Sequence, residues 1–318
     1  MNAKFSLLIS FVILLAASAC SFQKKLVPLN SMQDLEYPYP TKTVSLSNNI
    51  ELAYMDEGKP TAPALILIHG LGSYAPAWKN NIADLRKDYR CLAVDLPGYG
   101  KSSKGNYEGT MRFYADVLME FMDALKLESA TMVGHSMGGQ IAITASLAYP
   151  DRVPQLILVS PAGIETFNEG QKEWFREVIT AEGVRLTTVE QIKSNFGYNF
   201  FDIPKDAEFM IEDRINMRSA DDFEGYCYAI AQSVRGMVDG PVYDYLPDLK
   251  ARTLIIYGEQ DNLIPNRYLN PGSTSEIAKI GEERIPNSTM HLVDKAGHFV
   301  HFEQSEKVNS LILEFLKK

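Results

Sequence analysis

A serine in a glycine-rich segment is the first residue of this sequence that could do chemistry. Ser136 lies in the stretch "GHSMG" (134–138), which fits the pattern G-x-S-x-G. An apolar run typical of a buried strand leads into it, and small residues typical of a helix follow it. A sharp strand-to-helix turn of this kind lifts a serine hydroxyl clear of a sheet, at a helix N-terminus that favours negative charge. The pattern predicts that Ser136 is a nucleophile.

A serine hydroxyl is a weak nucleophile until a base takes its proton, and one of the five histidines fits that role. His298 lies between the last predicted strand and the last predicted helix, which would place it on the same rim of a sheet as Ser136. Asp261 follows the preceding predicted strand, so it can orient His298 and stabilise the imidazolium. The chain order Ser136, Asp261, His298 is the order that accompanies a G-x-S-x-G turn. If Asp261 does not serve, Glu165 is the next candidate for the acid.

The other histidines of this region are expected to play no direct part. His135 adjoins the nucleophile, so its side chain should point elsewhere, and His291 lies inside a strand. His301 follows His298 by one helical step and is expected to be packed or solvated. Asp95 also follows a predicted strand, but its proline-glycine setting predicts a structural turn.

The negative oxygen that forms when a serine attacks a carbonyl needs two hydrogen-bond donors. The backbone N–H of Met137, directly after the nucleophile, is expected to be one of them. The other should come from the loop after "ALILI" (64–68), where the stretch "HGLG" (69–72) resembles the H-G-x-G element of esterases. This resemblance makes the N–H of Leu71 the second donor and His69 a residue that organises the loop.

The elements that must position these residues alternate between strands and helices. Two short alternating segments, "TVSL" and "IELAYMD", predict an opening hairpin. Six later apolar runs suit strands that are buried on both faces: "ALILIHG", "RCLAVD", "SATMVGH", "QLILVS", "TLIIYG" and "STMHLVD". Helical patterns lie between most of them, at Trp78–Arg86, Thr110–Leu125, Gln140–Tyr149, Ser275–Gly281 and Val300–Leu316. This alternation predicts an α/β fold, with a mostly parallel central sheet flanked by helices.

Residues 164–248 lack a convincing buried strand and are helical in pattern. A structureless loop of this length is uncommon in a compact domain, so we predict a helical cap inserted between strands 6 and 7. The cap divides the core into residues 41–163 and 249–318. Most of its large apolar side chains are expected in its own core, and some should line a pocket over Ser136: Phe196 to Phe201, Phe209 to Ile211, Met217, Phe223, Tyr226, Tyr228 and Met237. Its arginines could instead bind an anionic group: Arg176, Arg185, Arg214, Arg218 and Arg235.

The N-terminal segment has the marks of a secretory signal peptide. Lys4 precedes the apolar stretch "FSLLISFVILLAASA", which is shorter than the roughly 20 residues that a membrane span needs. Cys20 follows directly, and the end of this segment resembles the bacterial lipoprotein signal, in which the cysteine becomes the lipidated first residue. Residues 1–20 are therefore expected to be a signal peptide, Cys20 the lipidation site and residues 21–40 a polar tether.

This second resemblance implies a lipid-anchored protein of the bacterial cell envelope, with the membrane as a partner. Ser21 is not the aspartate that marks retention in the inner membrane, so we expect the outer membrane and a catalytic domain that faces the periplasm. An uncleaved membrane anchor is the alternative.

Composition excludes other classes of function. The formal net charge of −9 argues against a nucleic-acid partner. The two remaining cysteines, Cys91 and Cys227, give no disulfide framework, and Cys91 is expected to be a buried small apolar residue. No cysteine and histidine cluster has the spacing of a zinc site, so no metal is expected.

Five motifs, in their order along the chain, resemble the α/β-hydrolase superfamily from about residue 41 to the end: "HGLG", "DLPGYGKS", "GHSMGG", "YGEQD" and "AGH". Within it, "VGHSMGGQIA", "LVSPAG" and the helical insertion look most like the monoacylglycerol lipases and small-ester hydrolases. The serine at the turn argues against dehalogenases and epoxide hydrolases, which carry aspartate there. The resemblance implies a carboxylic-ester hydrolase that acts on a small-molecule acyl ester through an acyl-enzyme and needs no metal or organic cofactor.

Two other functions stay open at this point. One is a C–C or amide hydrolase with the same triad, which a polar, arginine-bearing cap pocket would favour. The "HGLG" loop lacks the G-P-G continuation common in ring-cleavage-product C–C hydrolases, which lowers this alternative without removing it. The other is a tethered binding protein that kept the fold and lost catalysis, against which the complete set of Ser136, Asp261 and His298 speaks.

Overall fold

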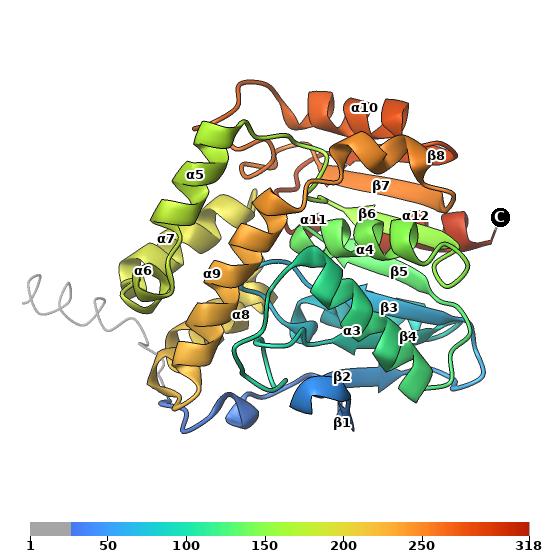
Figure 1. Cartoon of the computed structure of the whole chain (residues 1–318). Coiled ribbons are helices and arrows are strands. Elements are labelled where there is room, and N and C mark those ends of the chain that lie inside the picture. Colours follow the sequence, from blue (N-terminus) through green and yellow to red (C-terminus); the bar gives the residue numbers. More distant parts are fainter. Residues whose placement is uncertain (1–26, 318) are drawn as a thin grey trace, which may run out of the picture.

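The computed structural model describes residues 27–317, and its centre is an eight-stranded sheet (Figure 1). The strands lie in the order β1-β2-β4-β3-β5-β6-β7-β8. β1 pairs antiparallel with β2 and β2 antiparallel with β4, whereas every later pair is parallel. Their bounds are β1 (Thr41–Ser45), β2 (Glu51–Glu57), β3 (Ala64–Ile68), β4 (Arg90–Val94), β5 (Thr131–His135), β6 (Gln155–Val159), β7 (Arg252–Gly258) and β8 (Ser288–Val293). The predicted hairpin and mostly parallel sheet are confirmed.

The apolar runs are continuous because both faces of the central strands are covered. All five residues of β3 are buried, and successive side chains point to opposite faces. Ile66 and Ile68 join one hydrophobic core, and Leu65 and Leu67 join the other. A polar residue at any of these positions would be buried on one side or the other, which explains why the strand does not alternate.

Helices supply the other half of each core. α3 (Met111–Ala124), α4 (Met137–Ala148) and α10 (Thr274–Arg284) pack on one face of the sheet. α2 (Lys79–Leu85) and α12 (Ser305–Leu316) pack on the other.

The predicted helix 300–316 is broken in the structure. α11 (Val300–Glu303) ends at Gln304, whose backbone at φ −116° and ψ 45° is not helical, and α12 begins at the next residue. The apolar residues continue across this break, so their spacing gives no sign of it.

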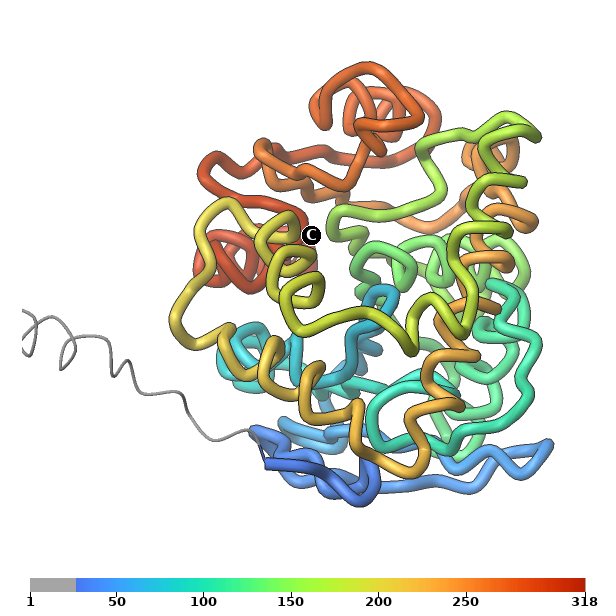
Figure 2. Tube along the Cα trace, turned by 90° about the vertical axis from the view of Figure 1, so that its left-hand side faces the viewer, coloured from blue at the N-terminus to red at the C-terminus, as the bar shows by residue number. Residues whose placement is uncertain are grey.

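Five α-helices lie between β6 and β7, as predicted for the cap: α5 (Glu169–Val178), α6 (Ala181–Arg185), α7 (Val189–Asn199), α8 (Glu208–Asn216) and α9 (Phe223–Asp239). They gather on one side of the sheet in Figure 1, and Figure 2 looks onto them. Most of α9 is buried, whereas α5 buries no residue. α9 therefore fastens the cap to the core, and α5 lies at its outer edge.

Side-chain caps explain where several of these helices begin. α5 starts at a capping box in which Asn168 accepts from the backbone of Gln171 and Gln171 accepts from the backbone of Asn168. Thr188 and Gln191 form the same arrangement at the start of α7. Each box satisfies two backbone donors that the first turn of a helix leaves without partners.

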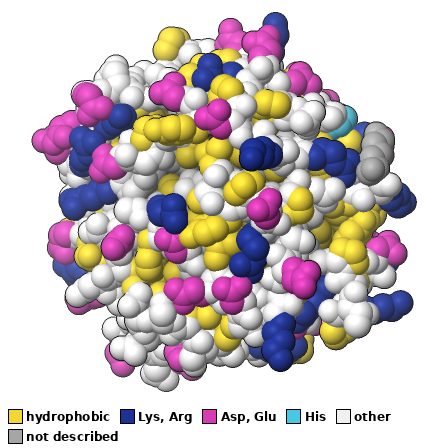
Figure 3. Space-filling model, turned by 45° about the vertical axis from the view of Figure 1, so that its right-hand side comes forward, with side chains coloured by type: hydrophobic (Ala, Val, Ile, Leu, Met, Phe, Trp, Pro, Cys, Tyr) yellow, Lys and Arg dark blue, Asp and Glu magenta, His cyan; other side chains and the backbone are white. Residues whose placement is uncertain are grey.

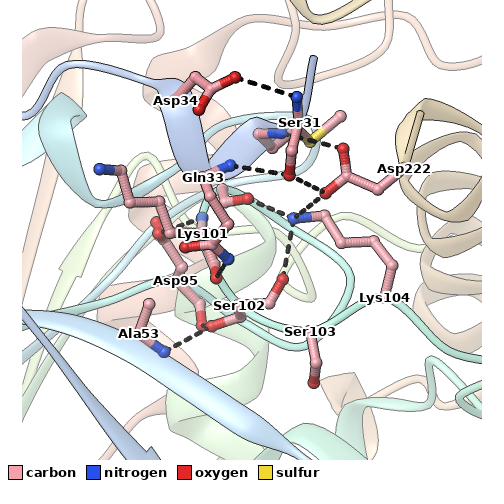
Figure 4. A network of polar contacts seen from close by, with 12 residues as sticks. Ser31, Gln33, Asp34, Ala53, Asp95, Lys101, Ser102, Ser103, Lys104 and Asp222 are labelled. Atoms are coloured by element: carbon pink, nitrogen blue, oxygen red, sulfur yellow. Dashed lines mark hydrogen bonds and ion pairs between the residues drawn. The ribbon is translucent and has the colours of Figure 1, made fainter. Parts of the chain in front are cut away.

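Part of the segment expected to be a tether is bound to the rest of the protein. The backbone N–H of Leu29 donates to Oγ of Ser219 at 2.8 Å, and Met32 is fully buried. Asp222, at the start of α9, accepts from the backbone N–H of Met32 at 2.9 Å and pairs with Lys104 at 3.6 Å (Figure 4). From Leu29 onward this segment is thus a strap across the cap and the core.

The predicted signal peptide, Cys20 and Ser21 lie outside the described residues. Among residues 27–317, no helix combines the length and the apolar character that crossing a membrane requires. On the face shown in Figure 3, basic and acidic side chains are interspersed with apolar ones.

Candidate active site

Ser136 is held in a strained turn between β5 and α4. Its backbone has φ 54° and ψ −119°, a left-handed region that residues with a side chain rarely adopt. Such a conformation costs roughly 1–3 kcal/mol and persists only where the surroundings impose it. Ser136 is partly exposed, whereas its neighbours His135 and Met137 are buried. The turn therefore presents the hydroxyl at the surface of an otherwise closed core.

Two glycines make this turn possible. A Cβ atom added to Gly134 would lie 2.2 Å from the carbonyl oxygen of Gly138. A Cβ atom added to Gly138 would lie 2.4 Å from the carbonyl oxygen of Ile68, at the end of β3. Backbone atoms cannot move aside for a side chain at these positions, so both must be glycine.

His298 and Asp261 form a buried pair next to this turn. Nδ1 of His298 donates to Oδ2 of Asp261 at 2.8 Å. The other carboxylate oxygen, Oδ1, accepts from the backbone N–H groups of Leu263 at 2.8 Å and Ile264 at 3.2 Å. With Nδ1 carrying the proton, Nε2 of the neutral imidazole has a free lone pair. The pair is thus arranged to take a proton through Nε2.

Ser136 and His298 line the same cavity, of about 620 Å³. Leu71, in the loop after β3, lines it as well. This loop lies against Ser136, because a Cβ atom added to Gly70 would be 3.0 Å from Cβ of Ser136. The structure therefore brings together Ser136, His298, Asp261 and the predicted oxyanion loop, although they come from four distant stretches of sequence.

The two predicted oxyanion donors are the backbone N–H of Met137, directly after the serine, and that of Leu71, which lines the same cavity as the serine. Met137 is the first residue of α4, so its backbone N–H has no acceptor within the helix. Leu71 is in a loop that the cap helps to hold, since Tyr226 of α9 donates its hydroxyl to the carbonyl of Gly72 at 2.8 Å. Nothing in the sequence pattern predicts this contact between Tyr226 and the loop.

His69 connects the loop after β3 to the loop after β4. Its Nδ1 donates to the carbonyl of Gly70 at 2.8 Å, and its Nε2 accepts from the backbone N–H of Leu96 at 3.1 Å. Burial lowers the pKa of the His69 imidazole to about 4, so the ring stays neutral and can make both bonds. His69 joins the loops after β3 and β4, as its proposed organising role requires.

Two more buried histidines pack beneath His298. Nε2 of His135 donates to the carbonyl of His298 at 3.0 Å, and its ring lies 4.8 Å from the ring of His298. His301 is fully buried, with its ring 4.3 Å from that of Trp78 and 4.5 Å from that of His135. Burial lowers the pKa of both imidazoles, that of His301 to about 3. Both side chains are therefore neutral packing residues, whereas His291 lies in β8 as predicted.

Glu303 clamps the loop that carries His298, a role that the sequence does not reveal. Its Oε2 accepts from the backbone N–H of Gly297 at 2.6 Å. Its Oε1 accepts from the backbone N–H groups of Phe201 and Asp202, in the cap, at 2.8 and 2.9 Å. The backbone N–H of Phe299 also donates to the carbonyl of Asn199 at 3.1 Å. The end of α7 and the histidine loop are thus fastened to each other.

The two other carboxylates considered from the sequence have structural partners. Oδ1 of Asp95 accepts from the backbone N–H of Ala75 and Oδ2 from that of Lys101, both at 2.8 Å, as a structural turn requires (Figure 4 shows the Lys101 contact). Oε1 of Glu165 accepts from the backbone of Asn266 at 2.8 Å and from Nδ2 of Asn270 at 2.7 Å. Neither carboxylate bonds to His298, which has Asp261 as its partner.

A second cavity, of about 460 Å³, adjoins the first inside the cap. The two share Leu71, Phe175 and Val234 as lining residues. Of the predicted pocket residues, Met237 lines the first cavity, and Phe196, Met210, Met217 and Tyr226 line the second. Arg214 also lines the second cavity, and its Nη1 is buried with no hydrogen-bond partner.

The remaining candidates for chemistry are inert in the structure. Cys91 and Cys227 are buried and unpaired, and burial raises the pKa of their thiols to about 12 and about 11. In the part of the chain that the structure describes, no cluster of three histidine, cysteine or acidic side chains is placed to hold a metal ion.

Comparison with known proteins agrees with this geometry. Residues 63–305 match the model of the alpha/beta hydrolase fold family. A 2-hydroxy-6-oxononadienedioate/2-hydroxy-6-oxononatrienedioate hydrolase of Paraburkholderia phymatum is 30% identical over 274 residues, which cover 81% of this chain and 88% of that one. A thermophilic esterase from Thermogutta terrifontis, solved with malate bound, is 27% identical with a TM-score of 0.68, covering 87% of this chain and 98% of that one.

A probable hydrolytic enzyme of Pseudomonas aeruginosa has a TM-score of 0.78 at 24% identity, and the match covers 92% of this chain and all of that one. The fold is therefore shared along almost the whole chain. The match to the family model over most of the sequence shows that the protein belongs to the alpha/beta hydrolase fold family.

Proposed function

We propose that this hydrolase cleaves carboxylic esters through an acyl-enzyme on Ser136. One observation carries the proposal: the Asp261–His298 pair opens onto the same cavity as a serine held at positive φ. Positive φ at a serine is uncommon and costs free energy, so it points to a function at this position. The likeness to an esterase at 27% identity supports the choice of ester.

In the proposed reaction, each residue of the site has a defined role. Oγ of Ser136 attacks the ester carbonyl carbon while its proton passes to Nε2 of His298. The carbonyl oxygen becomes negative and accepts from the N–H groups of Leu71 and Met137. His298 then gives the proton to the leaving alkoxide, and Asp261 stabilises the imidazolium in between. Water, activated by the same histidine, attacks the acyl-enzyme and releases the acid and free Ser136.

The cavities support a substrate with a medium-length acyl chain, of the kind found in monoacylglycerols. Their volumes fall in the range of about 300–1,000 Å³ typical of small-molecule sites. Each methylene that leaves water contributes about 0.8 kcal/mol, so four of them would raise kcat/KM roughly a hundredfold. We expect kcat/KM for p-nitrophenyl esters to rise from two carbons to a maximum at medium length. A flat profile or a maximum at two carbons would leave a small-ester hydrolase.

A C–C hydrolase is the second candidate, and Arg214 favours it. A buried guanidinium nitrogen without a partner can donate to an anionic or carbonyl group of a ligand. The relative from Paraburkholderia phymatum is named for a dioate, which carries two carboxylates. Substitution Arg214→Gln separates the two: it should leave the p-nitrophenyl acetyl ester, which is too short to reach the second cavity, unaffected and weaken turnover of a dianionic substrate.

The proposed location is the outer membrane, facing the periplasm, with a lipid on Cys20. The support is the sequence from Lys4 to Cys20. In the full chain, Cys20→Ala should move the protein from the membrane to the soluble fraction. Recovery of the variant in the membrane at the level of the unmodified protein would support an uncleaved helix instead.

A further inference from the structure

Most of the exposed large apolar side chains in residues 27–317 lie in the cap or next to it. Every large apolar side chain that residues 27–317 leave strongly exposed lies in the cap, in the loop after β7, or at the first described residue. They are Val27, Trp174, Val178, Leu186, Tyr198, Phe201, Ile203, Tyr245, Leu263 and Tyr268. The helices that cover the sheet expose none of comparable size. Exposed apolar side chains that form a patch are typical of a surface that binds a partner or a membrane.

Six of these side chains belong to α5, to α7 and the residues just after it, or to the loop after β7, which are elements that line the two cavities. We name them the apolar rim: Trp174, Val178, Tyr198, Phe201, Leu263 and Tyr268. Trp174 and Val178 are four residues apart on α5, so they share one face of that helix. Leu263 is 37% exposed and also lines the cavity.

The loop after β7 joins the two sides of the rim. It contacts α5 where Nε2 of Gln171 donates to the carbonyl of Leu269 at 2.7 Å. It contacts α7 where the Arg267 guanidinium lies 5.9 Å from the centre of the Tyr198 ring. The elements that carry the rim are thus joined to one another beside the cavity that Ser136 lines.

The N-terminal strap fixes where an anchor would hold the protein. Leu29 and Asn30 are hydrogen-bonded to Ser219 and Asp221 of the cap. Pro28 lines a surface groove together with Leu186. Figure 2 shows the described chain starting at the edge of the cap. Seven residue steps separate Cys20 from Val27, a span of at most about 25 Å even when fully extended. A lipid on Cys20 would therefore hold the part of the cap that the strap contacts within about 25 Å of the bilayer.

We infer that the apolar rim rests in the surface of a lipid bilayer, so that the cavity opens toward the membrane and takes acyl substrates from it. This inference rests on the proposed lipid anchor and extends the proposed ester hydrolysis to lipid-borne esters. Acidic side chains outnumber basic ones over residues 164–210, so the contact depends on apolar insertion and not on attraction to anionic lipids. Aromatic rings of the kind that Trp174, Tyr198 and Tyr268 provide favour the interface between water and acyl chains.

The protein carries its own probe for this contact. It has two tryptophans, of which Trp78 is fully buried and Trp174 is 40% exposed on the rim. The full chain, lipidated in a bacterial host, would be reconstituted into vesicles of phosphatidylcholine with and without brominated acyl chains, which quench tryptophan on contact. We expect a loss of emission in the brominated vesicles, and Trp174→Phe should remove that loss while leaving the emission of Trp78 unchanged.

A double substitution then tests whether the contact between the rim and the bilayer supplies substrate to the cavity. Trp174→Ser combined with Tyr268→Ser should lower turnover of an ester embedded in the vesicles at least tenfold. It should leave a water-soluble acetyl ester unaffected. Tyr245→Ser is the matched control, because Tyr245 is 58% exposed in a groove against α3 and α4, away from the rim.

Equal emission in both kinds of vesicle, from protein that sediments with them, would overturn the inference and leave ester hydrolysis intact. So would a dimer in analytical ultracentrifugation that buries Trp174 without quenching, since the rim would then bind a second copy of the chain. Protein that stays in the supernatant would overturn both the anchor and the inference. The quenching needs no turnover, so an inactive enzyme would contradict the proposed function alone.

Discussion

Replacing Asp261 by asparagine tests the proposed triad most directly. The side chain keeps its size, and its oxygen can still accept from the backbone N–H groups of Leu263 and Ile264. The amide nitrogen then replaces Oδ2 and faces Nδ1 of His298. Because that nitrogen is a donor, Nδ1 must become an acceptor and the ring proton must move to Nε2. The base would then hold a proton on the nitrogen that has to receive one from Ser136.

The alternative orientation of the amide is costly. If the introduced asparagine turned its oxygen toward His298, its nitrogen would face two backbone donors and both hydrogen bonds would be lost. Leaving buried donors without partners costs about 1–3 kcal/mol each, so the first orientation should prevail. Loss of the correct tautomer in serine triads lowers kcat about ten-thousand-fold. That factor corresponds to about 5.5 kcal/mol of lost transition-state stabilisation.

The measurement is kcat for a p-nitrophenyl ester at pH 7.5, with urea unfolding as the check on folding. Asp294→Asn is the control, since Asp294 is an exposed carboxylate whose oxygen accepts from Lys295 and Gln260. We expect the control to keep full activity. If Asp261→Asn stayed within tenfold of the unsubstituted enzyme, the reasoning would be refuted, and Glu165→Gln would be the next variant to measure.

Three further predictions concern the nucleophile, the cavity and the buried histidines. Ser136→Ala should abolish both turnover and labelling by a fluorophosphonate with an unchanged melting curve, and residual labelling would place the nucleophile elsewhere. Val234→Phe, at the junction of the two cavities, should lower kcat/KM for ten-carbon esters up to about a hundredfold and spare acetyl esters; equal losses on both would separate the second cavity from the acyl chain. His301 has a pKa of about 3 when folded against 6.5 when unfolded, so its contribution is fully present above pH 6.5 and is lost as the pH falls toward 3. His301→Phe should therefore reduce the fall in unfolding free energy between pH 7.5 and 5.0 by about 2 kcal/mol in urea titrations, and an unchanged fall would contradict the burial of a neutral ring.

The parts of the site that could be predicted from the sequence are those whose causes are local. Gly134 stands where a side chain would collide with the backbone of Gly138, so a pattern of five consecutive residues predicts the turn, although Gly138 itself lies against the distant backbone of Ile68. Asp261 and His298 were predictable because carboxyl ends of neighbouring parallel strands meet at one edge of a sheet. The fold followed from the same continuous apolar runs.

The remaining parts depend on contacts between distant segments that leave no spacing to detect. Glu303 acts on the backbone of Phe201 and Asp202, and backbone N–H groups are the same in every sequence. The polar composition of the strap predicts a tether, yet Met32 and Leu35 are buried. Two apolar residues three apart are too few to predict packing.

The joint between α7 and the histidine loop limits how this protein can be re-engineered. A cap is an attractive module to exchange between hydrolases, because it is one continuous insertion and determines which substrates fit. Here the backbone around Gly297 lies so close to the cap that an added Cβ would be 2.8 Å from the carbonyl oxygen of Asn199. A chimera that imports residues 164–248 alone would place the end of a foreign helix, in the position of α7, against Gly297, Phe299 and Glu303. His298, the proposed base, would then be displaced, and we expect the chimera to turn over every substrate more slowly before any new specificity could be detected. A productive exchange has to transplant residues 297–303 together with the cap, so these two stretches form one structural unit although almost 50 residues of core lie between them.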